Sequence, residues 1–185
     1  PAFVYPAPVA VADPYNWTET NTNHPAYGSG MSEWCANCHA DVQNSGNKHP
    51  SGSNARLGSR IAANYNSYVK TGYITGSRSA AYLSLVPFEL GTEDRSLLDP
   101  KSASGPAVGG KANVMCLTCH RAHASAFETI GRWDMHTTFI RDSHPKYGDS
   151  GVTGNDVLNS YYGRNMSAEY GDYQRQFCNK CHIQD

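Results

Sequence analysis

The feature that most constrains this chain is the motif Cys-x-x-Cys-His, which occurs at residues 35–39, 116–120 and 178–182. Cysteines three positions apart lie about one helical turn from each other, so their sulfurs point to the same side of the chain. This spacing suits two thioether bonds to the vinyl groups on one edge of a haem, and the following His can then bind the iron. We therefore expect three covalently attached haem c groups. Their attachment residues would be Cys35, Cys38, Cys116, Cys119, Cys178 and Cys181, and their proximal ligands His39, His120 and His182.

Other uses of a Cys-x-x-Cys pair explain the pattern less well. Zinc ribbons combine such pairs in twos, and three pairs do not divide that way. A redox dithiol does not account for a His after each second cysteine. With eight His in 185 residues, three such coincidences would arise on the order of once in ten thousand chains. A disulfide framework is excluded if haem is attached, because the chain has only six cysteines.

The composition is poor for a core built from side chains alone. The hydrophobic fraction is 39% and the mean hydropathy is −0.57. We expect a fold organised around its cofactors, with the haem-free chain largely unfolded, as for metal sites that form only on folding. The net charge of −1 makes no electrostatic case for nucleic acid. No apolar stretch approaches the roughly 20 residues that span a bilayer.

The pattern along the chain predicts a mainly α fold with extensive loops and little or no β-sheet. Residues 1–30 contain several prolines and favour an extended N-terminal arm, with a neighbouring subunit as a surface on which it could pack. Residues 31–185 are expected to form a single trihaem domain. Within it we expect short helices at the first haem motif with Ser32 as N-cap, over 56–70, 77–85 and 125–140, and from about residue 172. Turns rich in glycine are expected over 105–110 and 148–155.

The distal ligands decide what the irons can do. Five histidines remain after the proximal ones: His24, His49, His123, His136 and His144. His123 follows His120 by three residues and cannot reach the other face of the same macrocycle, so as a ligand it must serve a different haem. The residues His24, His49 and His144 each precede a proline, which biases them to extended conformation. We expect three of His24, His49, His123 and His144 to be distal ligands. The surplus of histidines predicts bis-histidine irons, which pass electrons and bind no substrate.

Residues 114–123 (VMCLTCHRAH), 132–134 (RWD) and 177–182 (FCNKCH) resemble a known family. It consists of extracellular multihaem c-type cytochromes that polymerise into conductive filaments, the cytochrome nanowires of the OmcE and OmcS type. The resemblance implies two axial histidines per haem and a continuous haem chain, with one distal histidine donated by the adjacent subunit. It implies His123 as the distal ligand of a neighbouring haem and His24 as a candidate for ligation across the interface. Such an open assembly requires head-to-tail contacts.

These observations predict an electron-transfer protein and not an enzyme. The main expectation is a protomer of an extracellular or cell-surface filament that passes electrons to redox partner proteins or external acceptors. One alternative is a monomeric periplasmic or cell-surface shuttle, and another is a reductase with one open haem. Haem c is attached outside the cytoplasmic membrane, and the first residue, Pro1, suggests a processed chain.

Overall fold

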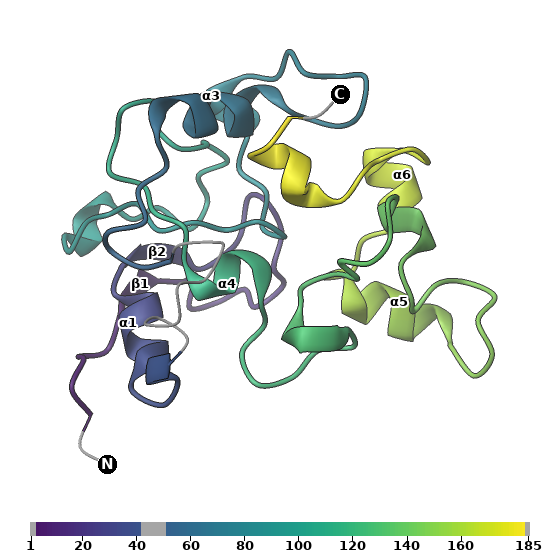
Figure 1. Ribbon diagram of the computed structural model, residues 1–185, viewed down its shortest axis with the longest axis horizontal. Helices are drawn as coiled ribbons and strands as arrows, with labels where there is room; N and C mark the ends of the chain where they lie inside the picture. Colours follow the sequence, from purple (N-terminus) through teal and green to yellow (C-terminus); the bar gives the residue numbers. More distant parts are fainter. Residues whose placement is uncertain (1–2, 42–50, 184–185) are drawn as a thin grey trace.

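The structure is a computed structural model that describes residues 3–41 and 51–183. In these ranges the protein consists of short helices joined by long loops. The named α-helices are α1 (Met31–Ala36), α3 (Ser59–Ser67), α4 (Cys116–Cys119), α5 (Gly154–Ser160) and α6 (Met166–Tyr170). The 3-10 helices are Arg78–Ala80, Arg95–Leu97, Glu128–Ile130, Ile140–Asp142 and Phe177–Lys180. In Figure 1, α1 lies near the N-terminal end, α5 and α6 lie together at the opposite side, and α4 lies between them. This arrangement confirms a loop-rich helical fold with little sheet.

A small antiparallel sheet pairs β1 (Val9–Val11) with β2 (Ala26–Ser29). Main-chain bonds extend this pairing, since the N–H of Gly91 donates to the carbonyl of Gly28 at 2.8 Å. A Cβ on Gly28 would lie 2.4 Å from the Thr92 carbonyl oxygen, so this position has room only for glycine. Part of the expected N-terminal arm is therefore folded against its own chain.

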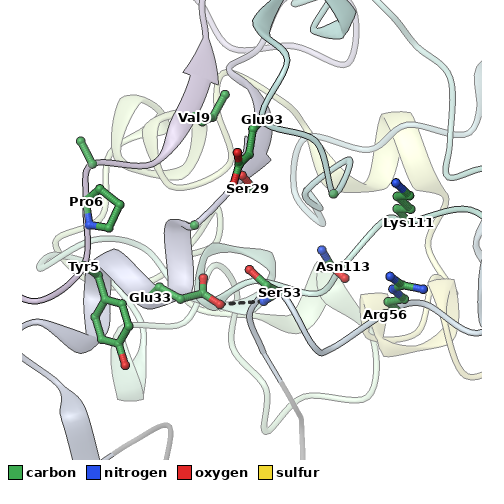
Figure 2. Close-up of a pocket in the computed structure, with 13 residues that line it drawn as sticks. Tyr5, Pro6, Val9, Ser29, Glu33, Ser53, Arg56, Glu93, Lys111 and Asn113 are labelled. Carbon is green, nitrogen blue, oxygen red and sulfur yellow. Dashed lines mark hydrogen bonds between the residues drawn. The ribbon is translucent and has the colours of Figure 1, made fainter.

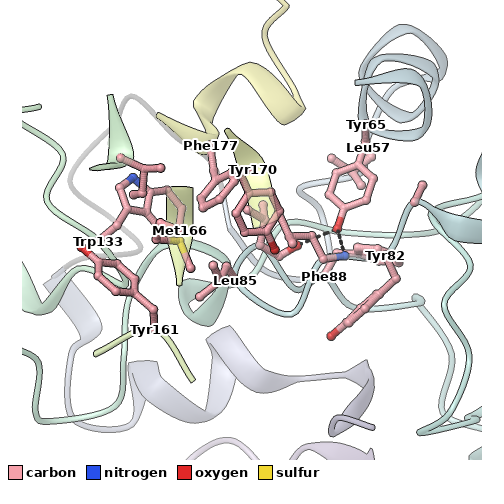
Figure 3. Packing of buried hydrophobic residues seen from close by; sticks show 14 of the residues in the cluster. Leu57, Tyr65, Tyr82, Leu85, Phe88, Trp133, Tyr161, Met166, Tyr170 and Phe177 are labelled. Carbon is pink, nitrogen blue, oxygen red and sulfur yellow. Dashed lines mark hydrogen bonds between the residues drawn. The ribbon is translucent and has the colours of Figure 1, made fainter. Parts of the chain in front are cut away.

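One apolar cluster connects the loops (Figure 3). Tyr65 and Tyr82 lie at one end of it, and Trp133 and Tyr161 lie at the other. Phe177 is 2% exposed and packs edge-on against Trp133, with ring centroids 5.6 Å apart. Because Phe177 directly precedes the third Cys-x-x-Cys-His motif, this cluster ties the motif to the rest of the fold.

The hydroxyl of Tyr65 joins two loop segments within this cluster. It donates to the carbonyl of Val86 at 2.9 Å and accepts from the N–H of Leu83 at 3.1 Å. We expect Tyr65→Phe to lower the free energy of unfolding by about 1–3 kcal/mol, because it leaves two buried main-chain groups unpaired. Denaturant unfolding of the haem-loaded protein measures this change, and Tyr73→Phe, on an exposed ring, is the matched control. Equal stability of the two variants would contradict the assigned role.

The helix predicted over residues 125–140 is wrong. The Ser125 hydroxyl accepts the N–H of Phe127 at 3.0 Å and donates to the carbonyl of Gly131, which forms a local turn instead of a helix cap. Thr129 and Ile130 have φ of 54° and 57°, outside the right-handed helical region. Only the short 3-10 turns remain helical in this segment.

The other predicted helices are shorter than expected. The helix predicted over 56–70 is limited to α3, and those over 77–85 and from about 172 are reduced to 3-10 turns. The predicted N-cap is also wrong, because Gly30 occupies that position and Ser32 lies buried inside α1. Turns do occupy 105–110 and 148–155, with positive φ at Gly109, Gly148 and Gly151. Within the described ranges, no helix has the length and apolarity to cross a bilayer.

Candidate haem-attachment sites

The three motifs adopt the same local turn, and we call them site I (residues 35–39), site II (116–120) and site III (178–182). In each site the N–H of the His donates to the carbonyl of the first cysteine. The distances are 3.0 Å for His39 to Cys35, 3.0 Å for His120 to Cys116 and 2.8 Å for His182 to Cys178. A five-residue turn closed in this way brings both thiols and the imidazole toward one region. All three imidazoles are exposed.

Sites I and II are packed directly against each other. The hydroxyl of Ser32 in α1 accepts the N–H of Cys116 at the start of α4, at 3.0 Å. The thiols of Cys35 and Cys116 also meet, and the hydrogen bond donated by Cys35 lowers the pKa of Cys116. Haems attached to these two cysteines would therefore start from adjacent points of the chain.

Site III lies next to site II. Burial raises the pKa of Cys181 to about 12, and the nearby Cys119 adds to this rise. Burial likewise raises the pKa of Cys119 to about 11, with Cys178 contributing. Site II thus lies near both of the other sites.

The side chain of Lys180 anchors site III to the core. Lys180 is 5% exposed, its ammonium donates to the carbonyl of Tyr68 at 2.8 Å, and it lies 4.7 Å from the centre of the Tyr65 ring. The amide of Asn64 in α3 donates to the carbonyl of Cys181 at 3.0 Å. These contacts hold the motif in place without using its thiols or its imidazole.

His123 faces His39 across a gap that suits a metal ion. The centroids of the two imidazole rings are 6.4 Å apart, with 40° between the ring planes. Two imidazoles on opposite sides of one metal ion each form a nitrogen–metal bond of about 2 Å. Adding the distance from each bonded nitrogen to the centre of its ring gives roughly 6 Å between the two ring centroids. The spacing at site I therefore fits a haem iron, which His39 and His123 would hold.

A closed loop holds His123 in this position. The main chain of His120 bridges to that of Gly131, and the N–H of Arg121 donates to the carbonyl of Ile130 at 2.8 Å. The Nδ1 of His120 lies 2.8 Å from the carbonyl oxygen of Thr129. A backbone partner at one ring nitrogen orients a metal-binding His and leaves its other nitrogen for the metal. The same loop could thus hold imidazoles for two different irons.

A hydrogen bond orients the His144 ring in a similar way. Its Nδ1 lies 2.7 Å from a carboxylate oxygen of Asp149, which also accepts the N–H of Lys146. These hydrogen bonds hold the pKa of Asp149 below its usual value. A carboxylate at Nδ1 is a common outer partner of metal-bound His. His144 is exposed, and Asp149 contacts its Nδ1 and not its Nε2. The Nε2 therefore suits a distal ligand.

The other histidines differ. His24 is buried, its ring stacks on Tyr82 with centroids 3.7 Å apart, and its two nitrogens lie 3.1 Å and 3.0 Å from the carbonyl oxygens of Pro25 and Ser102. Iron binding by the Nε2 of His24 would require this nitrogen to leave the Ser102 carbonyl, and the iron would have to reach a buried ring. His136 is exposed and its Nε2 contacts Glu128 at 3.2 Å. His49 lies outside the described residues.

Sequence reasoning missed the residues that position these ligands. Thr129 acts through its main-chain carbonyl, and Ser32, predicted only as a helix cap, contacts a segment distant in sequence, so no local pattern marks these roles. Asp149 lies in the predicted turn over 148–155, and its separation of five positions from His144 was the only available signal.

A cavity opens beside α1 (Figure 2). It has a volume of about 620 Å³ and borders α1, where the Glu33 carboxylate accepts the N–H of Ser53 at 2.7 Å. Arg56 and Lys111 lie together on its far wall. None of the motif cysteines or histidines lines it. The cavity is therefore separate from the proposed cofactor chemistry.

Comparison with known proteins gives consistent results. No protein-family model matches the chain. The chain is 43% identical over 207 aligned residues to C-type cytochrome OmcS of Geobacter sulfurreducens, which covers 100% of this chain and 47% of that protein. The cryo-EM structure of OmcS nanowires from this organism superposes with a TM-score of 0.81 and 41% identity, covering 100% of this chain and 51% of that one.

A second structure, of the outer membrane cytochrome S filament from the same organism, gives a TM-score of 0.80 and 40% identity, again covering 100% of this chain and 51% of the other. The chain thus spans about half the length of the relatives it matches. By sequence and by fold, therefore, this chain is related to the OmcS-like c-type cytochromes.

Proposed function

We propose that this chain carries three haem c groups and transfers electrons between them. The observation that carries the proposal is the 6.4 Å gap between the His39 and His123 rings, which suits one six-coordinate iron. The shared turn at all three motifs supports the same chemistry at sites II and III. When bound, haem supplies an iron that changes its oxidation state by one electron. Two axial imidazoles leave no position for a substrate, so we infer an electron carrier and not an enzyme.

The proposed ligand set follows from the geometry of the histidines. His39, His120 and His182 would be the proximal ligands, and His123 would be the distal ligand at site I. His144, oriented by Asp149, is the best placed distal ligand for one of the other two sites. The third distal ligand would come from His24 or His49.

We further propose that the chain, alone or as part of a longer protein, assembles head to tail into an extracellular filament. The relationship to OmcS supports this, since structures of OmcS are of nanowires and filaments. Residues 1–30 would provide the contact segment and residues 31–185 the haem-bearing domain. Tyr15 and Trp17 are 93% and 85% exposed, and burying them on a second copy would remove a large apolar surface from water. Electrons would then pass to redox partners or external acceptors.

The alternative is a monomeric shuttle at the cell surface or in the periplasm. The burial of His24 within its own chain favours this alternative, because no iron of a second subunit is needed to account for its position. In a filament with ligation across the interface, the His24 ring would instead have to turn outward.

Mass, spectra and electron microscopy of the secreted protein test the proposal together. We expect an intact mass of the polypeptide plus three haems, low-spin spectra that do not change with carbon monoxide after reduction, and fibres in negative stain. A mass equal to the polypeptide alone would refute haem attachment. Carbon monoxide binding by the native protein would support the reductase, and haem-loaded protein that stays monomeric at all concentrations would support the shuttle.

A further inference from the structure

Arg132 holds the turn of site II from beneath. It is 4% exposed. Its main-chain N–H donates to the carbonyl of Cys119 at 2.9 Å, and its side-chain Nε donates to the carbonyl of Leu117. Both acceptors belong to the last residues of α4, where helix carbonyls lack partners within the helix. One residue therefore satisfies two of the free carbonyls of the haem-attachment turn.

The far side of the Arg132 guanidinium is held by Tyr162. One terminal nitrogen donates to the Tyr162 hydroxyl at 2.6 Å and to the carbonyl of Ser84 at 3.2 Å. The guanidinium of Arg121, the residue after His120, lies 4.7 Å from the centre of the same tyrosine ring. Tyr162 has φ of 56°, a conformation that costs a residue other than glycine free energy and persists only where its surroundings impose it. The Tyr162 ring thus contacts the guanidinium groups of both Arg121 and Arg132, which adjoin site II.

The positive charge of Arg132 has no direct counter-ion. Its acceptors are main-chain carbonyls and a phenol, all neutral. No carboxylate in the part of the chain that the structure describes forms an ion pair with it, whereas the neighbouring Arg164 contacts Glu169 at 3.6 Å. Glu19 is a further acidic group near Arg132. Burial raises its pKa, and the charge of Arg132 is the strongest influence in the opposite direction.

A guanidinium keeps its charge at any pH at which the protein is folded. Buried charge acts at longer range than exposed charge, because the surroundings screen it less. Oxidised haem iron carries one more positive charge than reduced iron. A fixed cation beside the attachment turn therefore disfavours the oxidised form and raises the reduction potential.

We propose that Arg132 is a positioning residue that holds the site II turn and sets the reduction potential of the haem attached there above the value that bis-histidine ligation alone would give. This inference rests on the proposed function, since it requires haem at Cys116 and Cys119. It assigns to Arg132 an electrostatic role that is distinct from its contribution to packing.

Substitution of Arg132 in the haem-loaded protein tests the inference. We expect Arg132→Gln to lower the potential of one of the three haems so that its equilibrium with an external mediator shifts about tenfold toward the oxidised form, or about 59 mV for one electron. Arg132→Lys keeps the charge and should retain most of the potential. Spectroelectrochemical titration measures the potentials, intact mass gives the haem number, and the low-spin spectrum checks that both axial ligands remain.

The outcomes separate the two proposals. Three haems with unchanged potentials in Arg132→Gln would overturn this inference alone, whereas a native protein without haem would overturn the proposed function. Equal shifts in Arg132→Gln and Arg132→Lys would show a packing effect and also overturn it. If Arg132→Gln does not accumulate, Ser84→Asp adds a carboxylate beside the Arg132 and Arg164 side chains and keeps the main-chain acceptor of Arg132. It should lower the same potential, and an unchanged potential would again overturn the inference.

Discussion

Replacing His123 by alanine should leave three haems attached to each chain and give one of them an open sixth position. The reason is the placement of the His123 ring 6.4 Å from that of His39, where it would be the second ligand of the iron at site I. The expected result is one high-spin ferric haem per chain in the electronic spectrum and one molecule of carbon monoxide bound per chain after reduction. The potential of that haem should rise, because the lost imidazole stabilises ferric iron.

His136→Ala is the matched control for this prediction. His136 belongs to the same part of the chain and is exposed, and its Nε2 contacts the exposed Glu128 carboxylate. Its removal should leave the spectrum low-spin and the protein unable to bind carbon monoxide. If His123→Ala behaved like this control, the pairing of His123 with His39 would be wrong.

A chain in which the six motif cysteines are replaced by serine should lose essentially all of its folding free energy, which is about 5–15 kcal/mol for a domain of ordinary stability. The longest helix in the described ranges, α3, has only 9 residues. Isolated helices shorter than about 12–15 residues are marginal in water. The attachment turns lie between the loops of the core, so removal of three macrocycles would remove apolar surface that those loops pack against.

Circular dichroism during heating measures this loss. The haem-loaded protein should show a cooperative transition, and the haem-free chain should show little secondary structure and no transition. A variant with serine only at Cys178 and Cys181 gives an intermediate control, since sites I and II are joined through Ser32 and Cys116 independently of site III. A sharp transition in the haem-free chain would show that the side-chain core is sufficient.

The attachment turns were predictable from sequence because their chemistry is local. Five consecutive residues contain both thiols, the imidazole and the hydrogen bond that closes the turn. The loop-rich helical fold was also predictable, from the short helical patterns and turns along the chain. The pairing of His123 with His39 was not, because these residues are far apart in sequence and are brought together by contacts of α1 with α4.

The errors have the same origin. Ser125 has the sequence pattern of a helix cap, but its hydroxyl makes a turn that ends two residues later. His24 shares the His-Pro pattern of the candidate ligands, and only the folded chain reveals Tyr82 against its ring. Arg132 offers no signal in sequence because its acceptors are main-chain carbonyls, which every residue possesses.

The bridge between His120 and Gly131 has a consequence for biogenesis. With the proposed ligands, the loop that it closes would bring imidazoles to two neighbouring irons, so the first iron would gain its second ligand only after the chain beyond the second motif had folded back. Haem ligation would then follow the export of the chain, because a newly translocated segment would supply the second ligand of the haem attached before it.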